Sequence, residues 1–125
     1  MAKQSSVKWL DQPEEKDYPA AASYLGLLFK PQAVRSHILA LRRAAPTSFA
    51  AKDVLRASGL PLLPVTNAHV KRDAAKIRAG TRLSPILLVR KSKQEGLIIA
   101  DGYHRLCAVC IDNEDAMVPC RIAGS

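Results

Sequence analysis

The residues best suited to chemistry form the run Asp101-Gly102-Tyr103-His104-Arg105, between a short apolar segment and an expected helix. Gly102 can adopt a positive φ and so allow a ligand to approach the backbone closely. The first-turn amides of Tyr103, His104 and Arg105 would point to the same place as the positive end of the helix dipole. Because such a helix start with basic side chains binds phosphate, the run predicts a phosphate site.

Each side chain of this run has a candidate role. Arg105 could grip a phosphate through two parallel hydrogen bonds. Asp101 could cap the helix, orient His104, or hold a Mg²⁺ ion that bridges phosphates, so Asp101 and His104 are the candidate catalytic residues. A plain strand–turn–helix, with Asp101 as the cap and both basic side chains in solvent, fits the same residues. The run alone leaves both interpretations open.

Two other groups of reactive side chains have structural interpretations. Cys107 and Cys110 lie one helical turn apart in an apolar stripe, which is typical of small core residues, and we expect no zinc site. With Cys120 the chain has three cysteines, so a fully paired disulfide set is impossible and reduced thiols in the cytoplasm are expected. The carboxylates at 14, 15 and 17 stand in a polar, proline-containing stretch that is typical of a solvated loop.

The elements that must position the run follow from apolar spacing and from proline and glycine signals. The spacing predicts a short helix over 52–57, capped by Thr47 or Ser48 and ended at Gly59. Residues 60–65 suit a sheet edge or a turn, because two prolines interrupt them. The other expected helices are 20–29, one from Pro31 to Pro46, one from Asn67 to Gly80, and 103–111; the expected strands are 86–90, 97–100 and 118–122. This order predicts an α+β domain.

The net charge of +8 is concentrated in one segment. From Lys71 to Lys93 eight basic residues stand against a single acid, Asp73. A solvated basic face explains this pattern, and so does an anionic partner such as nucleotide phosphates or DNA. Aromatic residues make up only 5% of the chain and do not interleave with the basic run, which disfavours single-strand binding by base stacking.

Several classes of protein are excluded by missing signals. No apolar stretch reaches the roughly 18 residues that a membrane span needs, so no membrane partner is expected. The first residues lack the apolar core of a signal peptide, and we do not expect export. Neither a G-x-S-x-G sequence nor a Walker-type loop nor G-x-G-x-x-G occurs, which excludes the standard hydrolase, P-loop and Rossmann interpretations.

Residues 60–123 resemble the ParB/sulfiredoxin superfamily. The resemblance rests on the expected helix ending at Gly80, the segment Leu83–Arg90, the box within 100–108, and the closing segment Val118–Ile122. In ParB-type CTPases the box reads Gly-Glu-Arg-Arg, in sulfiredoxins Gly-Cys-His-Arg, and in free-serine kinases of this fold Asp-Gly-His-His-Arg. Tyr103 stands where sulfiredoxins have their reactive cysteine, which disfavours sulfinic acid reduction. No downstream helix-turn-helix or dimerisation domain is present, which disfavours chromosome partition.

Length and patterning predict a single domain over 1–125, with a polar arm at 1–18 and a helical segment at 20–58. The resemblance implies a ParB/sulfiredoxin-like mixed-sheet core at 60–123. It implies that the chain binds a nucleotide (ATP, ADP or CTP), with or without Mg²⁺, as a nucleotide hydrolase or phosphotransferase. The expected phosphate-binding residues are Gly102, Tyr103, His104 and Arg105, supported by Arg82 and Arg90 from the basic segment.

Two alternatives from other classes stay open. The first is a DNA-binding or nuclease-like module that uses the basic segment 71–93, with Asp101 as the only evident metal ligand. The second is a non-catalytic protein-interaction domain in which residues 20–58 form the binding surface. A homodimer is compatible with each of them.

Overall fold

The computed structural model describes residues 7–91 and 96–124. Within these residues the helices are α1 (Asp17–Leu25), α2 (Pro31–Arg43), α3 (Ala51–Ser58), α4 (Ala68–Ala79) and α5 (Tyr103–Asn113). The strands are β1 (Lys8–Trp9), β2 (Thr47–Ala50), β3 (Arg82–Leu83), β4 (Ile86–Arg90), β5 (Leu97–Asp101) and β6 (Met117–Ala123). The predicted α+β class is confirmed. Lys93 and most of the segment between the strands expected at 86–90 and 97–100 lie outside the described residues.

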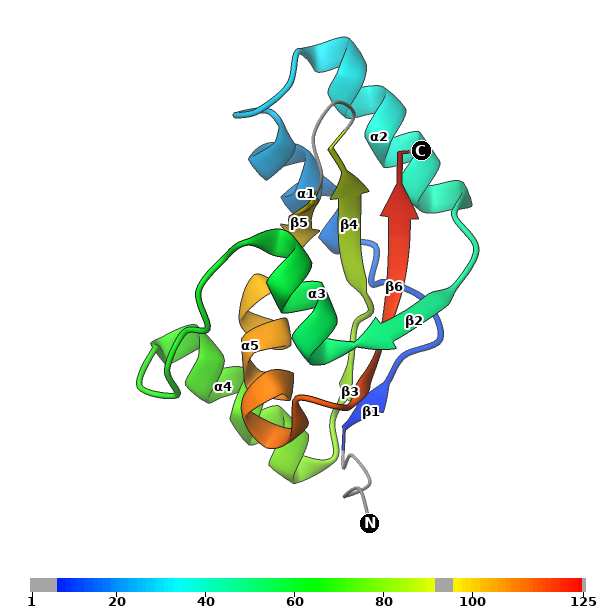
Figure 1. The fold of residues 1–125 in the computed structure, drawn as a ribbon. Helices are drawn as coiled ribbons and strands as arrows, with labels where there is room; N and C mark the ends of the chain where they lie inside the picture. Colours follow the sequence, from blue (N-terminus) through cyan, green and yellow to red (C-terminus); the bar gives the residue numbers. More distant parts are fainter. Residues whose placement is uncertain (1–6, 92–95, 125) are drawn as a thin grey trace.

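A mixed sheet with the strand order β2-β6-β4-β5 forms the centre of the molecule (Figure 1). Strand β4 runs parallel to β6 and antiparallel to β5, and β2 pairs antiparallel with β6. The register places Leu87 opposite Asp101 at one end of the β4–β5 pair and Arg90 opposite Leu97 at the other. A separate two-stranded sheet joins β1 to β3 in parallel.

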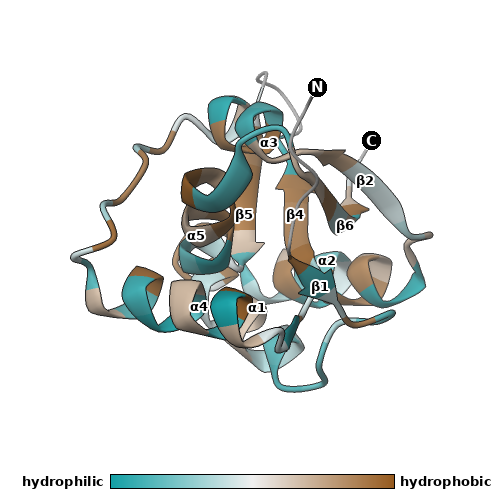
Figure 2. Cartoon of the chain, turned by 90° about the horizontal axis from the view of Figure 1, so that it is seen from below, coloured by the Kyte–Doolittle hydropathy of each residue, from teal (hydrophilic) through white to brown (hydrophobic). Residues whose placement is uncertain are grey.

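Helices cover both faces of this sheet, because the side chains of β4 are apolar on both sides. Ile86 and Leu88 belong to the core cluster shared with α3, α4 and α5, whereas Leu87 and Val89 belong to the cluster shared with α1 and α2. Figure 2 shows apolar strands in the middle and helices with hydrophilic residues around them. No helix among the described residues is long and apolar enough to cross a membrane.

The predicted boundaries around the functional run are confirmed by local geometry. Asn67 caps α4, its Oδ1 accepting from the amides of His69 and Val70 at 3.0 and 3.2 Å. Gly80 ends that helix with a φ of 74°, and Gly59 ends α3 with a φ of 70°. Strand β4 has the predicted bounds, and α5 begins at Tyr103 as predicted.

The prediction for residues 47–50 was wrong. Thr47 and Ser48 lie in strand β2, and α3 begins after Ala50 without a side-chain cap. The backbone of this segment pairs with β6, from the far end of the chain. Residues 20–58 are therefore not helical throughout, and the sheet is not contained in 60–123. Residues 60–65 form no strand.

The segment 20–58 also contributes to the core. Leu25 of α1 and Leu41 of α2 are fully buried against the sheet. Helix α1 spans 17–25 rather than the predicted 20–29, because its first turn begins within the acidic arm. In that arm the amide of Leu10 donates to the carbonyl of Leu83 at 2.8 Å, which continues the β1–β3 pairing.

Candidate functional site

The run 101–105 lies where β5 ends and α5 begins. Gly102 has a φ of 109°, and a Cβ atom there would lie 2.6 Å from Ile86 Cδ1 and 2.9 Å from Arg105 Nη2. Only glycine fits this position without strain or displacement of its neighbours. No side chain caps the start of α5, so the prediction that Asp101 would do so is wrong. The first-turn amides therefore have neither an intrahelical partner nor a side-chain cap.

An open polar pocket of about 280 Å³ lies over this helix start. Three segments line it: the residue before α1, one face of α4, and the run itself. The structure thus brings together all five residues predicted from the run. The complete lining is Lys16, His69, Arg72, Asp73, Lys76, Asp101, Gly102, Tyr103, His104 and Arg105.

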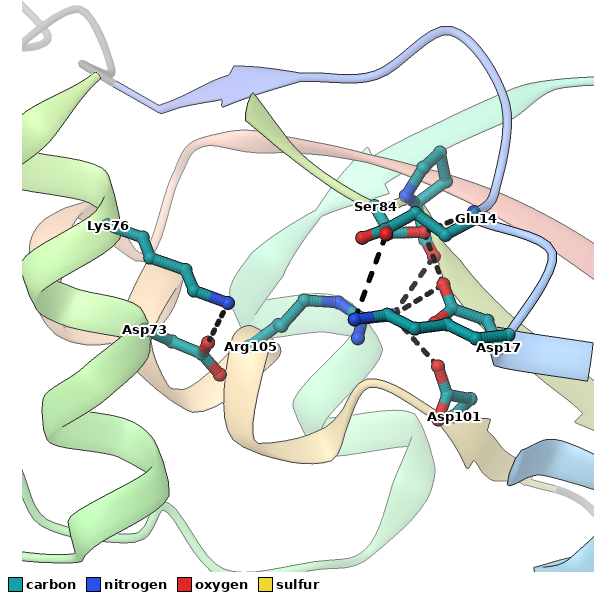
Figure 3. Close-up of polar contacts among 9 residues, drawn as sticks. Glu14, Asp17, Asp73, Lys76, Ser84, Asp101 and Arg105 are labelled. Carbon is teal, nitrogen blue, oxygen red and sulfur yellow. Dashed lines mark hydrogen bonds and ion pairs between the residues drawn. The ribbon is translucent and has the colours of Figure 1, made fainter. Parts of the chain in front are cut away.

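Arg105 is held between two carboxylates (Figure 3). Its Nη2 lies 3.1 Å from Asp101 Oδ2 and 3.6 Å from Asp17 Oδ2, and it donates to the carbonyl of Pro85 at 3.3 Å. The side chain is only 17% exposed. Asp17 is also buried, and it accepts a short hydrogen bond from the Ser84 hydroxyl. The interpretation in which Arg105 is solvated is therefore wrong, and its charge is opposed within the protein.

Three influences act on the pKa of the Asp101 carboxyl. Burial raises the pKa of the Asp101 carboxyl, and the neighbouring Asp17 carboxyl adds to that rise, whereas the Arg105 guanidinium opposes it. A carboxylate with a raised pKa is a better proton acceptor, so Asp101 has the character of a general base.

The same geometry does not suit a resident divalent cation at Asp101. The Arg105 guanidinium already occupies the position between the two carboxylates. Among residues 7–91 and 96–124 no group of three or more His, Cys, Asp or Glu side chains is placed to hold a metal ion. We derive no step through a metal bound by Asp101.

His104 stands on the α4 side of the pocket. Burial lowers the pKa of its imidazole, the neighbouring His69 and Arg72 lower it further, and Asp73 opposes them. The lowered pKa favours the neutral imidazole, in which one ring nitrogen can accept a proton. The hydroxyl of Tyr103 donates to the carbonyl of Pro61, and burial raises the pKa of that phenol.

The basic side chains of the pocket come mainly from α4. Arg72 and Lys76 lie on its exposed face, and Lys16 reaches the pocket from the other side. Lys76 Nζ is 3.9 Å from Asp73, and Lys16 Nζ is 3.7 Å from Glu14. Within the described part of the chain, Arg72 forms no salt bridge with a carboxylate; its guanidinium contacts the His69 ring instead.

Two predicted support residues do not reach the pocket. Arg82 lies in β3, opposite Lys8 of β1. Arg90 is at the far end of β4, because that strand runs away from Asp101. There it borders a separate, mostly apolar pocket of about 260 Å³ lined also by Phe49, Asp53, Val54, Ala57, Leu97 and Ile122.

Sequence reasoning missed several site residues, although spacing signals were present. Asp17, assigned to a solvated loop, occupies the same helix face as Ala21 and Leu25, at intervals of four. On α4 the missed pocket residues follow the i, i+3, i+4, i+7 pattern of a single helix face. These residues are His69, Arg72, Asp73 and Lys76.

The cysteines take no part in this site. Cys107, Cys110 and Cys120 are buried and free. Burial raises the pKa of Cys110 to about 11 and that of Cys120 to about 12, which keeps both as thiols at neutral pH. Low-pKa thiol chemistry therefore has no support at these positions.

Comparison of the chain with family models, with curated proteins and with solved structures finds no match. The resemblance to the ParB/sulfiredoxin superfamily accordingly stays a prediction based on the quoted motifs.

Proposed function

We propose that the polar pocket binds the phosphate groups of a nucleotide. The observation that carries the proposal is the convergence of three basic side chains, Lys16, Arg72 and Lys76, on the uncapped N-terminus of α5. A helix start supplies oriented amide donors, and the three cations supply charge. Together they form a binding surface for an anion with several oxygens.

The cations are available for a ligand. The pairs of Lys16 with Glu14 and of Lys76 with Asp73 are 3.7 and 3.9 Å long, and both lysines are exposed. The Lys16–Glu14 pair is exposed and contributes about 0–1 kcal/mol, whereas a hydrogen bond to a charged group contributes roughly 1.5–3 kcal/mol. In the Lys76–Asp73 pair Asp73 is buried, but the exposed lysine lies beyond hydrogen-bond distance of it at 3.9 Å. A phosphate can therefore compete for both lysines as well as for Arg72.

Arg105 has a different part in this proposal. Its charge is opposed by Asp101 and Asp17, and its Nη2 lies against the position that a Gly102 side chain would occupy. Arg105 thus positions the helix start, and the amides of the first turn contact the phosphate. This assignment replaces the two-bond grip on phosphate that the sequence predicted for Arg105.

Two further points support a nucleotide as the ligand. The run 101–105 resembles the corresponding box of the ParB/sulfiredoxin superfamily, whose members include CTP- and ATP-dependent proteins. The pocket also contains two proton acceptors, the neutral imidazole of His104 and the carboxyl of Asp101. The reaction that we assign is phosphoryl transfer or nucleotide hydrolysis, in which the protein mainly positions groups and neutralises charge.

The division of the basic segment favours this local site over a DNA-binding face. Arg72 and Lys76 line the pocket, whereas Arg82 and Arg90 lie on β3 and at the far end of β4. If the protein instead bound duplex DNA through this segment, its affinity for DNA would fall steeply as the salt concentration rises.

The experiment is thermal unfolding with ATP, ADP, CTP and GTP, each with and without Mg²⁺. A ligand at about 100 times its dissociation constant should stabilise the protein by about 2.7 kcal/mol. Arg72→Gln should weaken binding roughly tenfold or more, since it removes a charged hydrogen-bond donor. Arg78→Gln is the matched control, because Arg78 is exposed on the same helix and does not line the pocket. The absence of a shift with every nucleotide, or equal losses in both variants, would refute the proposal.

A further inference from the structure

Three rings line the pocket beside the basic side chains. The ring centroids of His69 and His104 are 4.8 Å apart, with 46° between the planes. The centroids of His104 and Tyr103 are 5.6 Å apart, with 40° between the planes. The rings thus form a row from the exposed face of α4 to the first turn of α5. Phosphate binding uses the amides of α5 and leaves the faces of these rings without a role.

Each end of the ring row is fixed by a contact of its own. The Tyr103 hydroxyl donates to the carbonyl of Pro61, and the Tyr103 ring packs against the core. At the other end a His69 ring nitrogen contacts the guanidinium of Arg72, one of the proposed phosphate ligands. The row is therefore held in place before a ligand arrives, which reduces the entropy lost on binding.

We propose that this ring row, defined as His69, His104 and Tyr103, receives the base of a mononucleotide while its phosphates lie on the basic side chains. The inference rests on the proposed phosphate site and adds to it a preference for ligands with a base. Stacking on aromatic rings suits every nucleobase, because each has a π face. It distinguishes a nucleotide from inorganic polyphosphate and from a sugar phosphate.

The size of the pocket agrees with a small ligand. Its volume of about 280 Å³ is near the lower end of the range of roughly 300–1,000 Å³ for small-molecule sites. Single-strand binding, in contrast, uses successive bases along an extended groove. The structure assigns this ring row to one base rather than to a nucleic-acid strand.

The test compares the affinity for ATP with the affinity for tripolyphosphate, which has the phosphates and lacks the base. The wild-type protein should bind ATP roughly tenfold or more tightly than tripolyphosphate. His69→Leu should lower this ratio, and His69→Phe should keep it, because phenylalanine retains an aromatic ring and loses the ring nitrogens, one of which contacts Arg72. The ratio is the informative quantity, since a displaced Arg72 would weaken both ligands together.

A control and a spectroscopic measurement complete the design. His37→Leu should leave the ratio unchanged, because His37 contacts Phe29 and lies outside the pocket. Proton NMR of bound ATP should show upfield shifts of the adenine protons with the wild type and with His69→Phe. These shifts should be smaller with His69→Leu. Equal binding of ATP and tripolyphosphate by the wild type would overturn this inference and leave the phosphate site standing. If neither ligand binds, the proposed function fails as well.

Discussion

The two ends of the β4–β5 pair differ in what surrounds their arginines. At the Leu87–Asp101 end, Arg105 is 17% exposed and lies between two carboxylates under a polar pocket. At the Arg90–Leu97 end, Arg90 is exposed beside a mostly apolar pocket. Both ends have an arginine and a neighbouring cavity, so neither feature alone marks a functional site.

The two ends differ in how many unusual features occur together. At the polar end, backbone conformation at Gly102, a buried Asp17 beside a partly buried Asp101, and basic groups from separate segments meet in one place. At the apolar end, Asp53 and Arg90 border the same cavity without forming a salt bridge. Perturbed and mutually constrained charges in a pocket are typical of functional sites. The comparison therefore identifies the Asp101 end as the candidate site.

Replacing each arginine in turn should give the largest effect on stability and the clearest contrast between the two ends. Arg105→Met leaves the carboxylates of Asp101 and Asp17 buried without their cation, and it should lower the free energy of unfolding by roughly 3–5 kcal/mol. Arg90→Met removes an exposed side chain and should change it by less than about 0.5 kcal/mol. Urea denaturation of both variants measures the difference.

A compensating variant shows whether the loss comes from unpaired charge. Asp17→Asn and Asp101→Asn, combined with Arg105→Met, remove all three charges and should recover a large part of the lost stability. If Arg105→Met proved as mild as Arg90→Met, the buried network would not stabilise the fold, and the contrast between the two ends would disappear.

Substitution of Gly102 should have the next largest effect. In Gly102→Ala the added Cβ would lie 2.6 Å from Ile86 Cδ1. The alanine would also have to adopt a φ of 109°. Overpacking and backbone strain together should lower the free energy of unfolding by roughly 2–4 kcal/mol. Gly59→Ala is the matched control, because Gly59 also has a positive φ but no atom within 4 Å of the added Cβ. Gly59→Ala should lower the free energy of unfolding by roughly 1–2 kcal/mol. Equal losses would show that the close contact with Ile86 is relieved by rearrangement.

The parts of the structure that could be predicted from the sequence are those with local causes. Asn67 and Gly80 delimit α4, and Gly102 marks the start of α5, because capping and positive φ depend on a few neighbouring residues. Strand β4 matches the strand expected at 86–90, and its continuous apolar run agrees with its burial on both faces.

The parts that could not be predicted depend on partners far along the chain. Residues 47–50 pair with β6, which lies far along the chain at Met117–Ala123, and no local signal identifies that partner. Asp17 meets Arg105 only because α1 packs beside β5. The spacing of Asp17 with Ala21 and Leu25 would have indicated burial of the carboxylate, yet not the guanidinium that it contacts.

The smallest predicted effect is on the pH dependence of stability. The pKa of His104 is lower in the folded protein than its ordinary value of 6.5. Below pH 6.5 the unfolded chain therefore binds the proton more readily than the folded protein does. The contribution of His104 to the free energy of unfolding is complete above pH 6.5 and is lost as the pH falls toward the pKa of His104 in the folded protein. The raised pKa of Asp101 acts with the opposite sign at lower pH, since the folded state binds that proton more readily.

His104→Gln separates the two contributions. The difference in free energy of unfolding between wild type and His104→Gln should shrink as the pH is lowered from about 8 to about 5. Only the wild type has an imidazole whose protonation at low pH favours the unfolded state. The contribution of Asp101 is present in both proteins and largely cancels. Arg90→Met, at the apolar end, should follow the wild-type profile throughout. A difference that stays constant over this range would mean that burial at the polar end does not hold the imidazole neutral, and His104 would lose its assignment as a proton acceptor.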